Sequence, residues 1–191
     1  MADSSGHVTG GFVRSARASD AAGLAHVQIA SWRSAFAGLV PDAVIEELTS
    51  AEAAAEWASR WRDAISAPPT SKHRVHVAVA EPGSPDLLGF AAAGPASDDD
   101  LWPATDGELY ELHVVPGAAA GGHDGRLLHA VADTFAEDGF RTGYTWALAG
   151  DEARIGFLET AGWARDGSRA SLDMGVKVPV VRLHTRLSPA A

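Results

Sequence analysis

The sequence predicts one α/β domain, or α+β in a stricter classification, with a mixed central sheet of about seven strands. The chain has 191 residues, which suits a single domain with a sizeable core. Helical and strand patterns follow one another through short loops, without a repeat or a low-complexity linker. Over residues 108–148 a strand, a glycine-rich turn, a helix and another strand occur in order. This segment demands a parallel crossover in the middle of the sheet.

The first third of the chain predicts one strand followed by helices. Residues 12–16 alternate apolar and polar side chains, as a half-buried strand does. Ser19-Asp20 then offers an N-cap for a helix. Pro41 begins a second helix, and residues 50–65 form a third with an apolar residue at every fourth position. Pro68-Pro69 ends that helix, because proline cannot continue the hydrogen-bond ladder.

The rest of the chain predicts six further strands and two helices. Residues 75–80 and 87–93 are strands around a proline-glycine turn, and the apolar run 108–115 is a buried central strand. A helix, a strand, a short helix and two final strands follow at residues 124–137, 142–148, 151–162, 163–174 and 180–187. The expected order is β-α-α-β-β-β-α-β-α-β-β, with four to five helices.

Composition excludes several classes of function. The chain has no cysteine, which removes disulfides, thiolate metal sites and cysteine nucleophiles. The formal net charge of −10 repels phosphate backbones and argues against general nucleic-acid binding. The acidic residues 98–100 predict a solvated loop. Residues 1–10 are small and polar, and we expect a disordered arm ahead of a domain at 11–188. Because no apolar run could cross a bilayer, a cytoplasmic protein is expected.

The glycine-rich turn at residues 117–125 has a chemical implication of its own. It lies between a buried strand and a helix, where free backbone N–H groups meet the positive end of the helix dipole. Small residues allow an anion to approach these groups, so the turn is a candidate diphosphate site. The alternative is a loop made of small residues in an alanine-rich protein.

Three segments carry a resemblance to a known family. Residues 31–42 read S-W-R-S-A-F-A-G-L-V-P-D, residues 107–116 read G-E-L-Y-E-L-H-V-V-P, and residues 157–163 read F-L-E-T-A-G-W. In this order they resemble S-W-R-x-A-Y-x-G-L-L-P-D, G-E-L-Y-x-L-Y-V-x-P and F-Y-E-x-x-G-W of one bacterial branch of the GCN5-related N-acetyltransferases. The likeness runs from about Val13 to Leu187. It implies that family's fold, acetyl-CoA as cosubstrate, and acetyl transfer to an amine by direct attack.

The resemblance also implies an acetyl-CoA site. The family's Q/R-x-x-G-x-G/A loop falls on residues 119–124, with Gly122 at the central glycine. The residues expected to hold the cosubstrate are Leu112, His113, Val114, Ala120, Gly121, Gly122, His123, Asp124, Gly125, Arg126 and Asp151.

Two positions depart from that loop pattern. Ala119 replaces the basic or amide residue, and Asp124 replaces the last small one. A carboxylate there would repel a diphosphate by about 1 kcal/mol or more. Two alternatives stay open: Asp124 is a plain N-cap that occupies the donors, or the loop is shifted so that Gly121 and Gly122 still admit the ligand.

Catalytic roles follow from the same resemblance. Glu108 corresponds to the glutamate that serves as general base in some members. Alternation along the strand places Glu111 on the opposite side of the sheet from Glu108 and Tyr110, which makes it the weaker candidate. The backbone amides of His113 and Val114 are expected to polarise the thioester carbonyl.

The general acid is the missing catalytic part. Leu158 stands where the family's tyrosine protonates the thiolate, and leucine donates nothing. Tyr110 and His113 are the candidate substitutes, and His113 can act as acid or base near neutral pH. No metal site is expected.

Aromatic residues predict the acceptor pocket. Trp32 and Phe36 lie where the family lines that pocket, and Trp102 in the acidic loop is a candidate lid, or else an anchor for its loop. The expected partner is a primary amine of a small molecule, with neither nucleic acid nor membrane, and a homodimer stays open. The competing hypotheses are a ligand-binding or regulatory protein on the same scaffold without acyl transfer, and other small-molecule chemistry in the same cleft.

Overall fold

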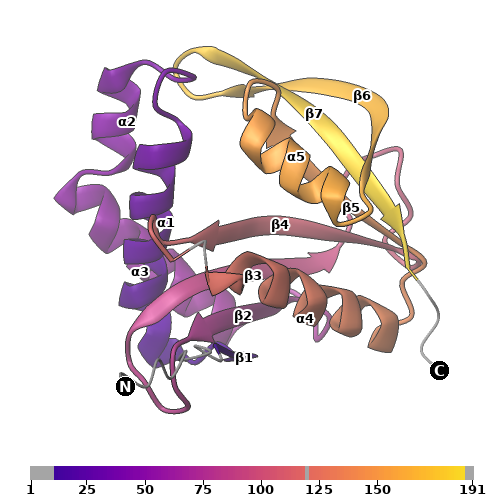
Figure 1. Cartoon of the computed structure of the whole chain (residues 1–191), viewed down its shortest axis with the longest axis horizontal. Coiled ribbons are helices and arrows are strands. Elements are labelled where there is room, and N and C mark those ends of the chain that lie inside the picture. The colour runs from indigo at the N-terminus through magenta and orange to yellow at the C-terminus, as the bar shows by residue number, and fades with distance from the viewer. Residues whose placement is uncertain (1–10, 119–120, 188–191) are drawn as a thin grey trace, which may run out of the picture.

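A seven-stranded mixed sheet forms the centre of the protein in the computed structural model, which describes residues 11–118 and 121–187 (Figure 1). The strand order is β1-β2-β3-β4-β5-β7-β6. The strands are β1 (Phe12–Ser15), β2 (Arg74–Val79), β3 (Leu87–Pro95), β4 (Asp106–Val114), β5 (Thr142–Leu148), β6 (Ala164–Asp173) and β7 (Lys177–Arg186). Among these pairs only β4 and β5 run parallel, so the predicted crossover is confirmed.

Three helices lie between β1 and β2, as the patterns after Ser19-Asp20, from Pro41 and over residues 50–65 predict, although the expected order string counted two. The helical elements are η1 (Ala18–Asp20), α1 (Ala21–Ala35), α2 (Asp42–Leu48), α3 (Ala51–Ser66), α4 (His123–Glu137) and α5 (Glu152–Thr160). The boundary between the second and third of these helices has a local cause. The hydroxyl oxygen of Ser50 accepts the amide hydrogen of Ala53 at 3.1 Å, so Ser50 caps a new helix directly after α2 ends.

The two faces of the sheet carry different helices. On one face Leu24 and Val27 of α1 pack on Val77 and Phe90. On the other face Leu127 and Phe135 of α4, with Ile155 and Leu158 of α5, pack on Leu109 and Leu112 of β4. Figure 1 shows α1, α2 and α3 together beside the sheet, with α4 crossing β2 and β3. Strand β4 therefore lies between two packed layers.

Strands β4 and β5 are paired over a short stretch and then separate. The paired residues are Asp106, Gly107 and Glu108 with Thr142, Gly143 and Tyr144. Beyond Glu108 the β5 side of β4 faces an opening in the sheet. An opening between two parallel central strands exposes backbone N–H and C=O groups that a ligand can bind.

A β-bulge in β4 changes which side chains share a face. Ala92 pairs with Glu111 and Ala93 pairs with Leu109, so Tyr110 is the extra residue of the strand. Strict alternation no longer holds across this point. Leu109 and Leu112 both pack in the α4 core, and Tyr110 and Glu111 line the same cavities on the other face. The prediction that Glu111 lies opposite Tyr110 is therefore wrong.

The acidic loop before β4 exposes Asp99 and Asp100 to solvent, as predicted, and ion pairs that were not predicted also hold it. Arg182 of β7 is 5% exposed, and its guanidinium contacts Asp98 at 2.8 Å, Asp100 at 2.6 Å and Asp166 at 2.6 Å. The indole N–H of Trp146 also donates to Asp98, at 3.0 Å. This cluster fastens the loop to the last two strands.

The ion pair near the N-terminal strand makes a prediction about acid stability. Arg14 donates to both carboxylate oxygens of the buried Asp20, at 2.7 and 3.0 Å, and this hydrogen bonding lowers the pKa of Asp20. A lowered folded-state pKa stabilises the protein above the unfolded pKa, and the contribution is lost as pH falls through the folded value. Asp20→Asn is expected to lose about 2 kcal/mol near neutral pH.

The measurement is denaturant unfolding of both proteins at several pH values. The difference between them should shrink as pH falls from about 4, the unfolded pKa, through the lowered folded pKa of Asp20. A difference that is independent of pH would contradict the assignment of this stabilisation to the charged carboxylate.

No helix in the described ranges is both long enough and apolar enough to traverse a lipid bilayer.

Candidate functional site

Two cavities meet where β4 and β5 separate. The central cavity has a volume of about 460 Å³ and lies beneath α1 and α3. The outer cavity, of about 400 Å³, runs along the end of β4 toward α4 and α5. Five residues line both cavities: Ser31, Ala35, Leu112, Asp151 and Arg154. The two cavities therefore form one cleft that passes through the opening in the sheet.

Alternate backbone groups of β4 face this cleft. The amide of Val115 donates to Leu88 of β3, and the carbonyl of Leu112 accepts from Arg154 on the other side. In an antiparallel ladder a residue directs its N–H and C=O to the same side, and neighbours alternate. Leu112 and Val114 therefore present their backbone to the cleft, whereas the amide of His113 points to β3. The expected carbonyl-polarising donor fits Val114 and not His113.

A hydrogen-bonded chain of three side chains crosses the cleft. The Nδ1 atom of His113 lies 3.0 Å from the hydroxyl oxygen of Ser31, and its Nε2 atom contacts the carboxylate of Glu111. Ser31 comes from α1, whereas Glu111 and His113 are two residues apart on β4 and share a face because no bulge lies between them. The side chain of Glu111 is 33% exposed. A carboxylate, an imidazole and a hydroxyl in series can accept, pass and donate a proton.

Glu108 lies outside this chain. It is 8% exposed, and its carboxylate accepts from the amide of Ser97 at 3.1 Å and from the Ser97 hydroxyl at 2.9 Å. Burial raises the pKa of Glu108, and the bonds from Ser97 oppose that shift. Among the described cavities Glu108 lines none. The raised pKa matches the expectation for a base, but the carboxylate is not positioned to reach an amine in the cleft.

Tyr110 borders the central cavity, with its hydroxyl directed elsewhere. The hydroxyl donates to the carbonyl of Pro95 and lies 3.5 Å from His73 Nε2. Burial, together with the charge of Glu108, raises the pKa of Tyr110 to about 12. Because the phenol proton is already donated to a backbone carbonyl, the geometry does not favour Tyr110 as the acid.

The glycine turn leads into α4 with Gly122 as its N-cap residue. Gly122 has φ of 66°, a left-handed conformation that suits glycine. The side chain of His123 is buried beneath the turn, where a Cβ on Gly121 would lie 2.6 Å from its Nε2. Arg126 donates to the carbonyl of Gly121 and so steadies the same turn. His123 and Arg126 thus support the turn, while Ala120 lies outside the described residues.

Asp124 fits neither of the two expected alternatives fully. It is the second residue of α4 and not the N-cap. Its Oδ1 atom accepts the amide hydrogen of Gly125 at 2.8 Å, which occupies one of the free donors. His123 and Asp124 are the first two residues of α4, so their amides lie at the positive end of the helix dipole. Because Asp124 also lines the outer cavity, it places a negative charge beside the remaining donors.

Arg154 is a residue of the cleft that the sequence analysis did not single out. Its guanidinium donates to the Leu112 carbonyl at 2.7 Å and lies at the junction of the two cavities. The nearby carboxylates include Glu111, Asp151 and Asp124. Asp151, expected near the cosubstrate, also caps α5 by accepting the Arg154 amide at 3.0 Å. Arg154 is thus the cation that offsets the acidic groups of the cleft.

The aromatic residues divide between the cavity and the surface. Trp32 and Phe36 line the central cavity and stack with ring centroids 5.6 Å apart, and Trp57 meets Trp32 edge-on at 5.1 Å. Trp102 is 71% exposed and lines none of the described cavities, so the structure does not support it as a lid. Leu158 is 0% exposed in the core beneath α5, and among the described residues no side chain takes the place of the family's tyrosine there.

Sequence reasoning missed the partnership of Glu111, His113 and Ser31, although a signal was present. Leu109 and Leu112 are apolar residues spaced by three within one strand, and both are buried. A regular strand cannot direct both to one core, so this spacing indicates a bulge. The position of Ser31 against β4 depends on how α1 packs on the sheet, which no local pattern encodes.

Comparison with known proteins agrees with this architecture. A curated relative, the uncharacterized N-acetyltransferase YuaI of Bacillus subtilis (strain 168), is 29% identical over 136 residues, covering 71% of this chain and 70% of the relative. No family model matches the chain.

Solved structures share the fold at low identity. The GCN5-related N-acetyltransferase described as aminotransferase, class-II from Rhodopseudomonas palustris aligns with TM-score 0.67 and 19% identity, over 92% of this chain and 95% of that one. The PaiA N-acetyltransferase of Thermoplasma acidophilum, in complex with coenzyme A, aligns with TM-score 0.63 and 15% identity, over 93% and 99%. A fold shared over more than nine-tenths of the chain shows that this protein has the fold of the GCN5-related N-acetyltransferases, and its sequence is similar to that of a curated N-acetyltransferase.

Proposed function

We propose that the protein transfers an acetyl group from acetyl-CoA to a primary amine of a small molecule by direct attack. The observation that carries the proposal is the cleft through the sheet, where two joined cavities meet at the Ser31–His113–Glu111 chain. One cavity would hold the amine and the other would admit the thioester. Proximity of this kind supplies much of the rate enhancement of an acyl transfer.

The residues around the outer cavity fit acetyl-CoA. The amides at the start of α4 lie at the positive end of the helix dipole, which favours a diphosphate, and the left-handed Gly122 begins that helix. The Leu112 carbonyl already accepts from Arg154, so the Leu112 amide and the backbone groups of Val114 are the ones that would hydrogen-bond an extended, amide-containing chain along the cleft. The Val114 amide would then donate to the thioester oxygen as negative charge develops on it.

Glu111 and His113 divide the proton transfers in this proposal. The amine nitrogen forms a bond with the carbonyl carbon and gives one proton to the Glu111 carboxylate. The carbon–sulfur bond breaks, and the thiolate takes a proton from the Ser31 hydroxyl. When both imidazole nitrogens carry protons, Nδ1 replaces the proton that Ser31 has given. Exchange with solvent then removes one proton from Glu111 and returns one to His113, so the proton count balances.

Calorimetric titration with acetyl-CoA, followed by an assay of free thiol release with a panel of primary amines, tests the proposal. Binding with a 1:1 stoichiometry and amine-dependent thiol release are the expected results. The proposal fails if millimolar acetyl-CoA produces neither heat nor a shift in melting temperature.

Asp124 provides a prediction about cosubstrate affinity. Asp124→Asn removes a negative charge from the outer cavity while the amide oxygen can still accept from Gly125. A repulsion of about 1 kcal/mol corresponds to roughly a fivefold change in affinity. We expect acetyl-CoA to bind about fivefold more tightly to the variant. Titrations at low and high salt check this, because screening should reduce the gain. Equal or weaker binding by Asp124→Asn would show that the carboxylate does not face the diphosphate.

A second candidate function is binding of acetyl-CoA without transfer. Two observations favour it: Leu158 is buried where the family's acid would lie, and Asp124 occupies the Gly125 amide. Acetyl-CoA binding without thiol release for any amine tested would support this alternative over the transferase.

A further inference from the structure

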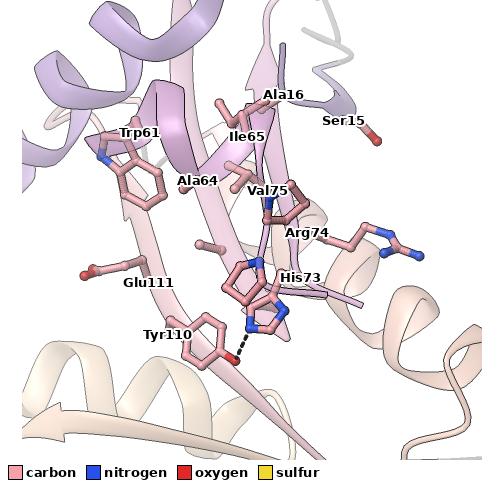
Figure 2. Close-up of a pocket in the computed structure, with 14 residues that line it drawn as sticks. Ser15, Ala16, Trp61, Ala64, Ile65, His73, Arg74, Val75, Tyr110 and Glu111 are labelled. Atoms are coloured by element: carbon pink, nitrogen blue, oxygen red, sulfur yellow. Dashed lines mark hydrogen bonds between the residues drawn. The ribbon is translucent and has the colours of Figure 1, made fainter. Parts of the chain in front are cut away.

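A third cavity, which we call the lateral pocket, lies beside the central cavity under the end of α3 (Figure 2). Its volume is about 270 Å³. An apolar cavity of about 150 Å³ is large enough to bind benzene in another protein, so this volume accommodates a ring with a short substituent. The lining residues are Ser15, Ala16, Trp61, Ala64, Ile65, Pro68, Pro69, His73, Arg74, Val75, Ala92, Ala93, Tyr110 and Glu111.

Small side chains create the space. Ala92 and Ala93 of β3 form part of the wall on the sheet side, and Ala64 contributes from α3. Position 94, next to Ala93, has to be glycine for the rings of Tyr110 and His73 to fit. A Cβ there would lie 2.9 Å from the Tyr110 hydroxyl and 3.0 Å from His73. The rings of Tyr110 and His73 are thereby free to stack, with centroids 6.0 Å apart.

The polar atoms of the aromatic side chains that line the pocket already have hydrogen-bond partners within the protein. The indole N–H of Trp61 donates to Gln28 at 2.8 Å, and the Tyr110 hydroxyl donates to the Pro95 carbonyl. The Nδ1 atom of His73 lies 2.9 Å from the Thr70 hydroxyl. The rings therefore present carbon faces to the pocket, which favours an apolar occupant.

The lateral pocket opens onto the candidate reaction site. Tyr110 and Glu111 line it and the central cavity alike, because the β-bulge brings both to one face of β4. At this junction Glu111 lines both cavities, and its carboxylate contacts His113 on the side of the central cavity. The one lining arginine, Arg74, points away from the rings in Figure 2, and its guanidinium lies 3.4 Å from Asp138 of the α4 end. Charge and shape at the junction thus suit a molecule with a cationic or basic nitrogen and an apolar body.

We infer that the lateral pocket binds the apolar body of the acceptor, so that the preferred substrate is a primary amine carrying about one ring, with its nitrogen at Glu111. This inference rests on the proposed function for the identity of the reaction, but the pocket itself can be tested by binding alone. The distinguishing probes are 2-phenylethylamine, which fills the pocket, and ethylamine, which leaves it empty.

The test compares kcat/KM for the two amines in the native protein and in two variants of α3. Ala64→Leu places a larger side chain at the pocket, at an exposed helical position where leucine is well tolerated. Ala55→Leu makes the same change at an exposed position of the same helix that lines none of the described cavities. A ratio of two rate constants is independent of the fraction of active protein.

The native protein should favour 2-phenylethylamine by at least about tenfold in kcat/KM, the scale on which apolar pockets discriminate. Ala64→Leu should reduce that ratio about tenfold, and Ala55→Leu should leave it unchanged. A native ratio near one, or an equal loss in both variants, would overturn the inference while amine acetylation itself stands.

Equilibrium titration with 2-phenylethylamine separates this inference from the proposed function. If the native protein and Ala55→Leu bind the amine, Ala64→Leu does not, and no thiol is released, then the pocket is correct and the transferase proposal is wrong. If none of the three proteins binds it and ethylamine is acetylated equally well by all of them, then the pocket assignment is wrong.

Discussion

Replacing Arg182 with alanine is expected to lower the free energy of unfolding by about 3–5 kcal/mol, because it leaves the carboxylates around it, of which Asp98 and Asp166 are partly buried and Asp100 is exposed, without their buried cation. The side chain is 5% exposed and contacts three of them, Asp98, Asp100 and Asp166, at 2.6 to 2.8 Å. It also lies 5.3 Å from the ring centroid of Tyr144 and donates to the Ser168 hydroxyl at 2.9 Å.

The effect is large because one residue joins three parts of the chain. Arg182 is on β7, Asp166 is on β6, and Asp98 and Asp100 belong to the loop that enters β4. The hydrogen bond from Arg182 lowers the pKa of Asp100, which shows that the folded state favours the charged carboxylate. Without the guanidinium, carboxylates that now share it would repel one another.

Urea unfolding and thermal melting of Arg182→Ala provide the measurement. A loss of this size corresponds to a decrease in melting temperature of roughly 6–20 °C for a chain of this length. Arg165→Ala is the matched control, because Arg165 is 43% exposed and its contacts to Glu152 and Glu159 are longer, at 3.4 and 3.3 Å. Exposed pairs of that kind contribute about 1 kcal/mol or less. Similar losses in the two variants would contradict a special role for the buried arginine.

Most of the fold was predictable because its signals are local. The strand expected at residues 142–148 begins and ends at those residues in the structure. Asp151 caps the following short helix, as expected. The strand–glycine turn–helix–strand order fixed the parallel pairing of β4 with β5, since only a crossover connection allows it. The helix expected over residues 50–65 is also present, and Ser50 caps its first turn.

The site was less predictable because it depends on contacts between distant segments. Trp32, Phe36 and Asp151 were expected at the cleft and do line it. Glu108 was expected there through its position in a motif, but burial against Ser97 removes it from the cavities. One extra residue in β4 brings Glu111 to the cavity side of the strand. It does so because it breaks the side-chain alternation on which the comparison of Glu108 and Glu111 relied.

The same bulge yields the prediction with the largest effect on catalysis. Glu111→Gln should reduce kcat by about 10²–10⁴-fold, the usual contribution of a positioned acid–base group. Glutamine keeps the size of the side chain and can still accept from His113, but it cannot take a proton from the amine. The acid limb of the pH–rate profile should disappear in this variant if Glu111 is the group whose ionisation it reports.

Glu108→Gln is the matched control, at a position earlier on the same strand β4. Its amide oxygen can keep both hydrogen bonds from Ser97, and the native carboxylate lines none of the cavities among the described residues. We expect this variant to retain a kcat close to that of the native protein. A slow Glu108→Gln beside an active Glu111→Gln would contradict the assignment and restore the base that the motif predicts.

The double variant Glu111→Gln/His113→Gln then tests whether the two groups act as one unit. Residues that share one hydrogen-bond network and one proton-transfer step have non-additive effects, so the second substitution should cost little once the first is made. Independent roles would instead multiply the two losses. Because the Ser31–His113–Glu111 chain has continuous contacts across the cleft, we expect the double variant to be about as slow as Glu111→Gln alone.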